Sequence, residues 1–381
     1  MPRKIKVAEV VSRLESGGVE SMLLNYLGHF KHPEDFDIHI ITQDINDERC
    51  VKQFQDAGYT VDIVTHKRKS ILKNVIELYR LMHFERFNVV HAHTTLTNFY
   101  ILWIARLTGA KKLISHSHNS FVSKSKVKQA IWSVLKMLNK ASANIWMACG
   151  HDAGVFLYGE KAVRSGKVQI LNNAIELEKY AFNSEARDRI RREYNIGKTD
   201  YVIGHVGRFM KQKNHKYLIG IFAEFNRRVP DSYLLLLGTG ELEDEIHHYV
   251  NERGLSDRVI FTGSVANVED FYSAMDVFVL PSLYEGFPVV SVEAQAADLP
   301  ILISDNVDPS CDITNNVNFI PVNLPFTIWV NEIINFSTQK RNTLILDVLK
   351  TKNYDIHNEA KKLESIYKNY ICLFDYLFIS S

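Results

Sequence analysis

Residues 278–297 read FVLPSLYEGFPVVSVEAQAA, and this stretch decides the fold class. The apolar run at residues 277–280 predicts a buried strand that stops at Pro281. After a short loop, Pro288 stands at the expected start of a helix and is followed by mostly apolar residues. Strand, tight turn and apolar helix are typical of a parallel α/β unit, in which ligands gather at the carboxyl end of the strand.

Two carboxylates interrupt this apolar stretch. Glu285 lies in the loop, and Glu293 falls well inside the predicted helix. A charge on so apolar a helix needs a partner, because burying an unpaired charge is costly. Either Glu293 points to solvent, or both carboxylates accept hydrogen bonds from the hydroxyl groups of a sugar-like ligand.

The composition is typical of a soluble globular protein. The 381 residues allow two domains of ordinary size, and 46% of them are hydrophobic while 23% are charged. The basic N-terminus is followed by an apolar run only one strand long, so we expect no signal peptide. No stretch approaches the ~18 apolar residues of a membrane span. The cysteines form no CxxC pair, which favours reduced thiols and a cytoplasmic protein; they are Cys50, Cys149, Cys311 and Cys372.

The net charge of +1 hides an uneven distribution. Residues 1–180 contain 25 Lys and Arg against 17 Asp and Glu, whereas residues 181–381 contain 20 against 27. Between Glu85 and Asp152 there is no acidic residue, but there are nine basic ones. We therefore expect the first half to meet an anionic surface or acceptor. Nucleic acid is not the expected partner, because this block lacks aromatic interleaving and any recognisable nucleic-acid module.

A lysine-rich segment within this block, from Lys124 to Lys140, predicts an amphipathic helix. Its apolar stripe fits an ordinary helix that packs on the core. Its basic flank, with Trp132, fits a helix that touches anionic lipid headgroups, which would place the protein on the inner face of the cell membrane. Both interpretations stay open.

Two predicted strands of the first half end in His91-Ala-His93 and His116-Ser-His118. On a strand, this spacing puts both rings of a pair on one face, as in some metal sites. A metal site would want acidic ligands nearby, and this part of the sequence has none, so we expect no bound metal. We expect His118 and Asn119 to form a polar rim at the end of their strand instead.

The second half offers a stronger candidate site at residues 207–216, GRFMKQKNHK. Four cations follow a strand that ends in glycine, and a helix is predicted directly after them. Fixed cations and the free N–H groups of a helix N-terminus both favour a diphosphate. We expect Arg208 and Lys213 to bind it, and Lys211 and Lys216 to be ordinary surface lysines.

Strands and helices alternate along both halves, which predicts an α/β protein with two doubly wound parallel sheets facing a cleft. We expect a first domain at residues 1–180 and a second at residues 181–355. A last helix, within residues 356–381, is apolar enough to pack back on the first domain. Residues 305–356 show no clear pattern.

Six motifs, in this order, resemble the GT-B-fold glycosyltransferases of family 4, a retaining group with two Rossmann-like domains. They are GGVE at residues 17–20, HSHN at 116–119, GRFMKQK at 207–213, GTGELEDEI at 238–246, VIFTG at 259–263 and PSLYEGFPVVSVEAQA at 281–296. Arg-x4-Lys followed by Glu-x7-Glu is a highly specific combination, and the resemblance extends to about residue 304. HAH, HSHN and KAVRSGKVQILNNAIELEKY are most similar to the branch that builds bacterial capsular polysaccharides and exopolysaccharides.

The resemblance implies roles for the matched residues. Arg208 and Lys213 would bind the diphosphate of a nucleotide-sugar, and His118 would line the sugar and acceptor side. Glu293 would hold the ribose hydroxyls, and Glu285 a hydroxyl of the donor sugar. With Arg208, Lys213, Glu285 and His118 as catalytic candidates, the other substrate-binding candidates are Gly17, Gly18, Asn119, Gly286, Phe287, Pro288, Glu293 and, near the base, Phe261, Thr262 and Gly263.

The resemblance also implies an activity. A hexosyl or N-acetylhexosaminyl group would pass, with retention and without a bound metal, from a nucleotide-diphosphate sugar, with UDP-sugar expected. The acceptor would be a polyprenyl-diphosphate-linked saccharide or an oligosaccharide. The alternatives are an epimerase or hydrolase of the same fold and a non-catalytic nucleotide-sugar-binding protein. Departures from the family pattern at Ala174, Thr239 and Asp298 predict altered donor or acceptor detail, with activity kept.

Overall fold

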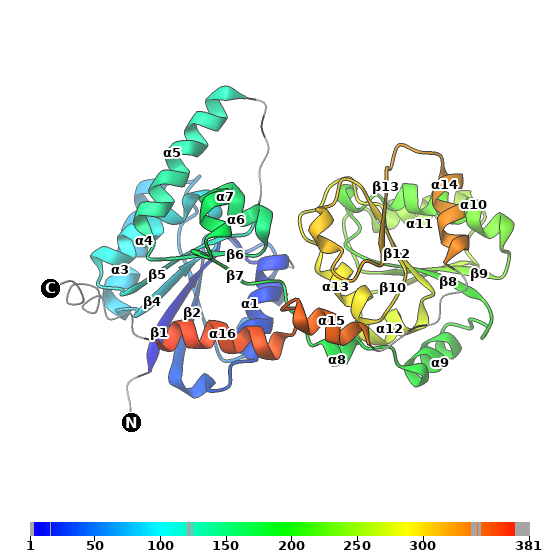
Figure 1. Ribbon diagram of the computed structural model, residues 1–381, viewed down its shortest axis with the longest axis horizontal. Coiled ribbons are helices and arrows are strands. Elements are labelled where there is room, and N and C mark those ends of the chain that lie inside the picture. The colour runs from blue at the N-terminus through cyan, green and yellow to red at the C-terminus, as the bar shows by residue number, and fades with distance from the viewer. Residues whose placement is uncertain are drawn as a thin grey trace. The chain divides into compact units, whose positions relative to one another are not determined.

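The computed structural model describes residues 4–15, 17–119, 123, 125–336, 341 and 344–369. The chain divides into two compact units, each built around a parallel sheet (Figure 1). Unit 1 comprises Met1–Ala174 and Ile356–Ser381, and unit 2 comprises Ile175–Asp355. The sequence predicted the first boundary after residue 180. The structure has it earlier because α8 (Leu177–Tyr180) packs on Val292 and Ala296 of unit 2.

In its described residues, unit 1 contains a seven-stranded sheet with the order β3-β2-β1-β4-β5-β6-β7. The winding reverses between β1 and β4, which makes this pair the topological switch point of the sheet. The strands are β1 (Ile5–Val10), β2 (Phe36–Thr42), β3 (Thr60–Ile63), β4 (Val89–Ala92), β5 (Lys112–Ser117), β6 (Ile145–Ala148) and β7 (Val168–Ile170). The helices are α1 (Gly18–Gly28), α2 (Glu48–Asp56), α3 (Ile71–Glu85), α4 (Asn98–Leu107), α5 (Lys126–Ser142), α6 (His151–Tyr158), α7 (Glu160–Arg164) and α16 (Ile356–Lys368).

The C-terminal helix α16 belongs to the core of unit 1. Its apolar side chains, among them Leu363 and Tyr367, are buried together with residues of α1, β1 and β2. The carboxylate of Glu364 accepts hydrogen bonds from the backbone N–H groups of Lys31 and His32 at 2.7 and 3.2 Å. The helix therefore ties the far end of the chain to its first strand. The part of the predicted helix beyond residue 369 lies outside the described residues.

In its described residues, unit 2 contains a six-stranded sheet with the order β10-β9-β8-β11-β12-β13, so its switch point lies between β8 and β11. The strands are β8 (Tyr201–Val206), β9 (Ser232–Leu237), β10 (Val259–Gly263), β11 (Val277–Leu280), β12 (Ile301–Ser304) and β13 (Val317–Ile320). The helices are α8, α9 (Ser184–Glu193), α10 (His215–Arg228), α11 (Glu243–Glu252), α12 (Val268–Ala274), α13 (Val289–Ala296), α14 (Phe326–Asn335) and α15 (Ile345–Thr351). β13, α14 and α15 lie within the region for which the sequence showed no pattern.

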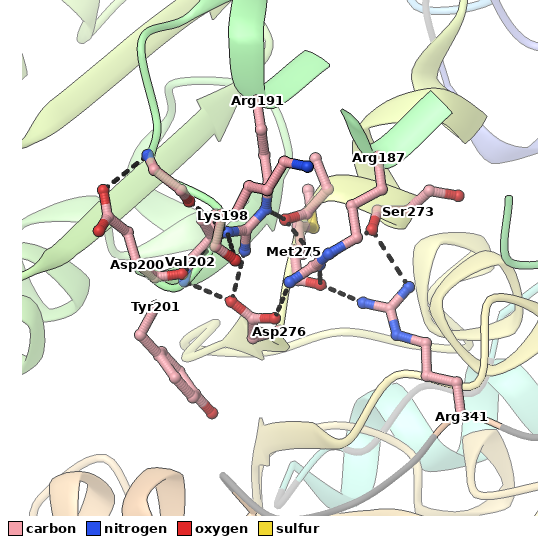
Figure 2. A network of polar contacts seen from close by, with 12 residues as sticks. Arg187, Arg191, Lys198, Asp200, Tyr201, Val202, Ser273, Met275, Asp276 and Arg341 are labelled. Carbon is pink, nitrogen blue, oxygen red and sulfur yellow. Dashed lines mark hydrogen bonds and ion pairs between the residues drawn. The ribbon is translucent and has the colours of Figure 1, made fainter. Parts of the chain in front are cut away.

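An arginine network fixes the strongly charged helix α9 to this sheet (Figure 2). Arg187 and Arg191 donate to the two carboxylate oxygens of Asp276 at 2.6 and 2.7 Å, and both also donate to carbonyls at the end of α12. Arg341 donates to the carbonyl of Met275 beside them. Cations at a helix C-terminus are favourable because the free carbonyls carry partial negative charge. The backbone N–H of residue 202 donates to Asp276 at 2.8 Å, so the network also holds the starts of β8 and β11 in register.

Candidate active site

The loops that follow β8 and β11 are joined at the switch point of unit 2. The backbone N–H of Leu283 donates to the carbonyl of Gln212 at 2.8 Å, and the side-chain amide of Gln212 donates to the carbonyl of Tyr284 at 2.9 Å. Asn214 takes a left-handed conformation and donates to the carbonyl of Pro281 at 3.1 Å. These bonds bring two motifs that lie about 70 residues apart in sequence into one site.

A short ion pair lies inside this joined loop. Nζ of Lys213 lies 2.6 Å from Oε1 of Glu285, and the hydroxyl of Ser282 donates to the same oxygen at 2.9 Å. Both charged side chains are largely buried, with exposed fractions of 15% and 12%. At such low exposure an ion pair is screened little by solvent, so the contact with Lys213 holds Glu285 in one orientation.

Arg208 differs from Lys213. It lies in the same loop after β8, but its side chain is exposed and has no hydrogen-bond or ion-pair partner within the part of the chain that the structure describes. The loop is held tightly beneath it, because a Cβ on Gly238 would lie 2.3 Å from the carbonyl oxygen of Gly207. Arg208 is thus a free cation on a rigid support.

Glu293 is held by two tyrosines. The hydroxyl of Tyr272 donates to Oε2 at 2.7 Å, and the hydroxyl of Tyr180 donates to Oε1 at 3.3 Å. Burial raises the pKa of Glu293, while the hydrogen bonds from both tyrosines act in the opposite direction. The sequence left open whether Glu293 points to solvent, and the structure shows a partly buried carboxylate with named partners. Tyr272 lies in none of the motifs of the sequence, and Tyr180 is the last residue of KAVRSGKVQILNNAIELEKY but received no predicted role.

Gly286 lies beside Glu285 with open space around it. A Cβ on Gly286 would meet no atom within 4 Å, and no positive φ requires a glycine there. The protein itself therefore leaves this volume free. Phe287 packs on the ring of Tyr354 at 5.7 Å, and Pro288 caps α13, which begins one residue later than the sequence predicted.

The predicted base-side residues lie at the end of β10. The ring of Phe261 stacks on His247 at 3.6 Å, and the hydroxyl of Thr262 donates to the carbonyl of Gly263 at 3.1 Å. Gly263 has a φ of 67° and its carbonyl accepts from the N–H of Gly238 at 2.9 Å. These contacts connect the end of β10 with the end of β9, next in the sheet to β8.

In unit 1, the predicted rim residues follow β5. His118 is half-buried and Asn119 is exposed. Nε2 of His118 lies 2.8 Å from Nδ1 of His93, and Nε2 of His93 lies 2.8 Å from Oε2 of Glu9. Glu9 belongs to no motif. The one sign of it in the sequence is that an acidic residue stands inside an otherwise mostly apolar strand.

The glycine pair of unit 1 opens α1. Gly17 caps the helix and Gly18 is its first residue; a Cβ on Gly18 would meet nothing within 4 Å. The buried carboxyl of Glu20 lies close to Gly17, and burial raises its pKa to about 7.

The lysine-rich segment forms α5, although Lys124 lies outside the described residues. Trp132, which the sequence placed with the basic flank, packs on Phe156 at 5.8 Å, as in an ordinary core helix. Within the apolar stripe, Val127, Ile131 and Val134 are exposed, and Met137 beside them is exposed too. No helix in the described part of the chain combines the length and apolar character that crossing a bilayer requires.

Comparison with known proteins decides the family. Two family models match the chain. The model of Glycosyltransferase Family 4 matches residues 16–179, and the model of Glycosyl transferases group 1 matches residues 186–320. The chain is 31% identical over 373 residues to EpsF of Bacillus subtilis (strain 168), which is classed as a glycosyltransferase, covering 95% of this chain and 96% of that one. This chain is a family 4 glycosyltransferase. The branch that the motifs indicated, of capsular polysaccharide and exopolysaccharide transferases, is confirmed.

Two further relatives of this glycosyltransferase are informative. It is 26% identical over 381 residues to the Escherichia coli UDP-Gal:alpha-D-GlcNAc-diphosphoundecaprenol alpha-1,3-galactosyltransferase, covering 97% of both chains. The crystal structure of Anabaena Alr3699/HepE in complex with UDP has a TM-score of 0.69 with 18% identity and 95% coverage of both chains. The predicted GT-B fold, with two Rossmann-like parallel-sheet domains, is confirmed.

Proposed function

We propose that this glycosyltransferase moves a hexosyl or N-acetylhexosaminyl group from a UDP-sugar to a polyprenyl-diphosphate-linked saccharide, with retention of configuration. The observation that carries the proposal is the site at the switch point of unit 2, where exposed Arg208 shares a loop with the Lys213–Glu285 pair. The choice of UDP is supported by the bound nucleotide of the Anabaena protein, and the acceptor by the name of the Escherichia coli relative.

The cations serve the leaving group. When the bond from the anomeric carbon to the diphosphate oxygen breaks, the nucleoside diphosphate gains negative charge. Arg208 and Lys213 would stabilise this charge, and a contact that strengthens in the transition state accelerates the reaction. Because these two side chains offer positive charge at a fixed place, we propose that the transfer needs no metal ion.

The two glutamates serve as acceptors of hydrogen bonds. Glu285 is oriented by Lys213 and Ser282 and would accept from a hydroxyl of the donor sugar. Glu293 is oriented by Tyr180 and Tyr272 and would accept from the ribose hydroxyls. With both carboxylates positioned for binding, we propose front-face attack: the acceptor oxygen bonds to the anomeric carbon on the side that the diphosphate leaves, and a donor phosphate oxygen takes its proton.

The exposed part of α5 fits a lipid-linked acceptor. Its N-terminal end extends away from the rest of unit 1 (Figure 1), with Val127 and Ile131 exposed and Lys126 and Lys128 beside them. Apolar residues flanked by lysines favour binding in the headgroup region of an anionic bilayer. We propose that the protein docks on the membrane surface through this helix.

The proposal is tested with the purified full-length chain, the donors UDP-galactose, UDP-glucose, UDP-N-acetylglucosamine and GDP-mannose, and a GlcNAc-diphosphate-polyprenol acceptor. We expect product with the anomeric configuration of the donor, formed only with the acceptor present and at an unchanged rate in EDTA. Equal consumption of the donor without acceptor would indicate a hydrolase or epimerase. Binding of UDP-sugars without turnover would indicate a binding protein, and use of GDP-sugars alone would overturn the choice of UDP.

A further inference from the structure

A polar cluster fills the switch point of unit 1, and one of its members is the predicted site residue His118. The cluster combines strand ends with the C-terminal helix, and five of its six side chains are buried, with exposed fractions of at most 5%. Only His118 is half-buried. The members are Glu9 from β1, His91 and His93 at the end of β4, His116 and His118 at the end of β5, and Tyr367 from α16.

The hydrogen bonds within this cluster assign the protons on two rings. An ionised carboxylate only accepts hydrogen bonds, so at 2.8 Å from Oε2 of Glu9 the Nε2 atom of His93 must donate. Burial, together with the neighbouring His91, lowers the pKa of His93 to about 4, so His93 is neutral and its Nδ1 atom carries a lone pair. Nε2 of His118, 2.8 Å from that atom, must therefore donate as well.

Glu9 is the fixed end of this series of hydrogen bonds. Burial alone would raise the pKa of Glu9, but His91 and the hydrogen bonds from His91 and His93 hold it below its ordinary value. The hydroxyl of Tyr367 donates to its other oxygen at 2.5 Å. Glu9 therefore stays an acceptor, and the direction of every bond between it and His118 is set.

The remaining nitrogen of His118 is available to a ligand. Nδ1 of His118 has no hydrogen-bond partner among the described residues. Nε2 of His116 also has none but is fully buried, whereas Nδ1 of His118 is not among the fully buried atoms that lack a partner. Burial, with the neighbouring His93 and His91, lowers the pKa of His118 well below the ordinary value, so this ring is neutral too. A neutral imidazole with its proton on Nε2 offers only a lone pair at Nδ1.

We propose that Glu9 and His93 are positioning residues that hold His118 neutral with its proton on Nε2, so that Nδ1 of His118 accepts a hydrogen bond from a hydroxyl of the sugar ligand. This inference rests on the proposed function, because it names the ligand group that His118 recognises. A hydroxyl can donate to this lone pair, whereas an ionised phosphate oxygen cannot. His118 would therefore recognise a sugar hydroxyl and not an ionised phosphate.

A metal ion is the competing occupant of the cluster. His91, His93 and His116 can place one nitrogen each within 4.8 Å of the others. However, His91 and His116 already bond to each other at 3.1 Å, and both nitrogens of His93 are engaged. A metal held by these three rings would have to break the bond from His93 to Glu9 or to His118, so metal binding and the proposed proton arrangement exclude one another.

Two substitutions of His118 distinguish the acceptor role of Nδ1 from the donor role of Nε2. An Asn side chain places its amide near the position of Nδ1 and can still offer an acceptor oxygen there, whereas Gln reaches the position of Nε2 and can still donate to His93. We expect His118→Asn to keep a kcat/KM at least about tenfold higher than His118→Gln, since only the first retains the acceptor. The reverse order, or equal values, would overturn the proposal. The same pair of substitutions at exposed His248 is expected to give equal, unchanged values.

Nuclear magnetic resonance tests the proton arrangement without any transfer assay. In full-length protein with ¹⁵N-labelled histidine, the signals of His118 are assigned by their loss in His118→Asn. We expect a protonated Nε2 and an unprotonated Nδ1 at pH 7, and a mixture of proton positions in Glu9→Gln. A cationic ring, a proton on Nδ1, or one equivalent of zinc in the purified protein would each overturn the inference. A wild-type protein that shows the expected signals but transfers no sugar would refute the proposed function and, with it, the ligand assigned to Nδ1, while the proton arrangement would stand.

Discussion

The two units use the same place in a parallel sheet, but they fill it with opposite chemistry. At the switch point of unit 1, the buried carboxylate of Glu9 belongs to a cluster with four histidines. The histidine of this cluster that is only half-buried, His118, is neutral because burial lowers its pKa. At the switch point of unit 2, the exposed group is a permanent cation, Arg208, beside an ion pair. The topology brings strand ends together in both cases. On the proposals above, the neutral ring of His118 would suit a hydroxyl and the cation of Arg208 would suit a diphosphate.

The largest expected effect comes from removing the exposed cation of unit 2. Arg208→Ala should lower kcat by about 10²–10³, the usual cost of losing one group that stabilises transition-state charge. The melting temperature should not change, because the exposed side chain of Arg208 makes no hydrogen bond or ion pair with the described residues. Lys211→Ala in the same loop is the control and should stay within a few-fold of wild type. Equal losses in both variants would mean that only the general positive field matters.

Gly286→Ala tests whether the open volume beside Glu285 belongs to the ligand. The added methyl group meets no protein atom, so stability should be unchanged. A ligand displaced by about 1 Å would lose about 10² in rate. Gly254, whose φ is +66°, is the matched control: alanine there should lower the melting temperature and leave kcat/KM intact. Unchanged transfer in Gly286→Ala would place the donor sugar elsewhere.

Glu20→Gln tests how unit 1 tolerates charge near its glycine pair. The pKa of Glu20 is raised from 4.5 to about 7, so the folded state holds a proton that the unfolded chain releases. Stability from this group is fully present below about pH 4.5 and falls as the pH rises towards 7. Glu20→Gln should remove this fall and stabilise the protein at pH 8 by roughly 2 kcal/mol. Melting temperatures measured between pH 4.5 and 8 check it; parallel curves for both proteins would contradict it.

Tyr272→Phe tests the positioning of Glu293. Losing the 2.7 Å hydrogen bond should raise the KM for the donor about tenfold with little change in kcat, since ribose binding is equal in ground and transition states. Tyr180→Phe should have a smaller effect, because its contact is 3.3 Å long. A fall in kcat at constant KM would show that Glu293 acts in the chemical step.

The smallest effect concerns the membrane. Lys128→Ser on α5 should weaken binding to phosphatidylglycerol vesicles at low salt about fivefold. This factor corresponds to the roughly 1 kcal/mol of binding free energy that one lysine contributes at an anionic surface. Lys361→Ser on α16, also exposed, is the control and should bind as wild type does. If the wild-type protein is not retained by these vesicles, α5 is not a docking helix.

The sequence predicted most strands, because each parallel strand is a short apolar run followed directly by its loop. The motifs predicted the GT-B fold through their resemblance to family 4. Prediction from the sequence failed where the pattern is weak. β13 lies in a polar stretch, and its identity as a strand depends on pairing with β12. The stripe of α5 was ambiguous, since periodicity shows that one face is apolar but not how much of that face finds a partner.

The sequence by itself determined which chemical groups stand at the ends of strands: Arg208 and Lys213 after β8, Glu285 after β11, and His118 after β5. Only the tertiary structure decided what holds them. Glu9 and Tyr367 are 358 residues apart yet share a hydrogen bond, and Tyr180 reaches Glu293 across 113 residues. Such partners meet because helices and strands pack on a common core, and a hydrogen bond formed between distant parts of the chain leaves no periodic trace in either segment.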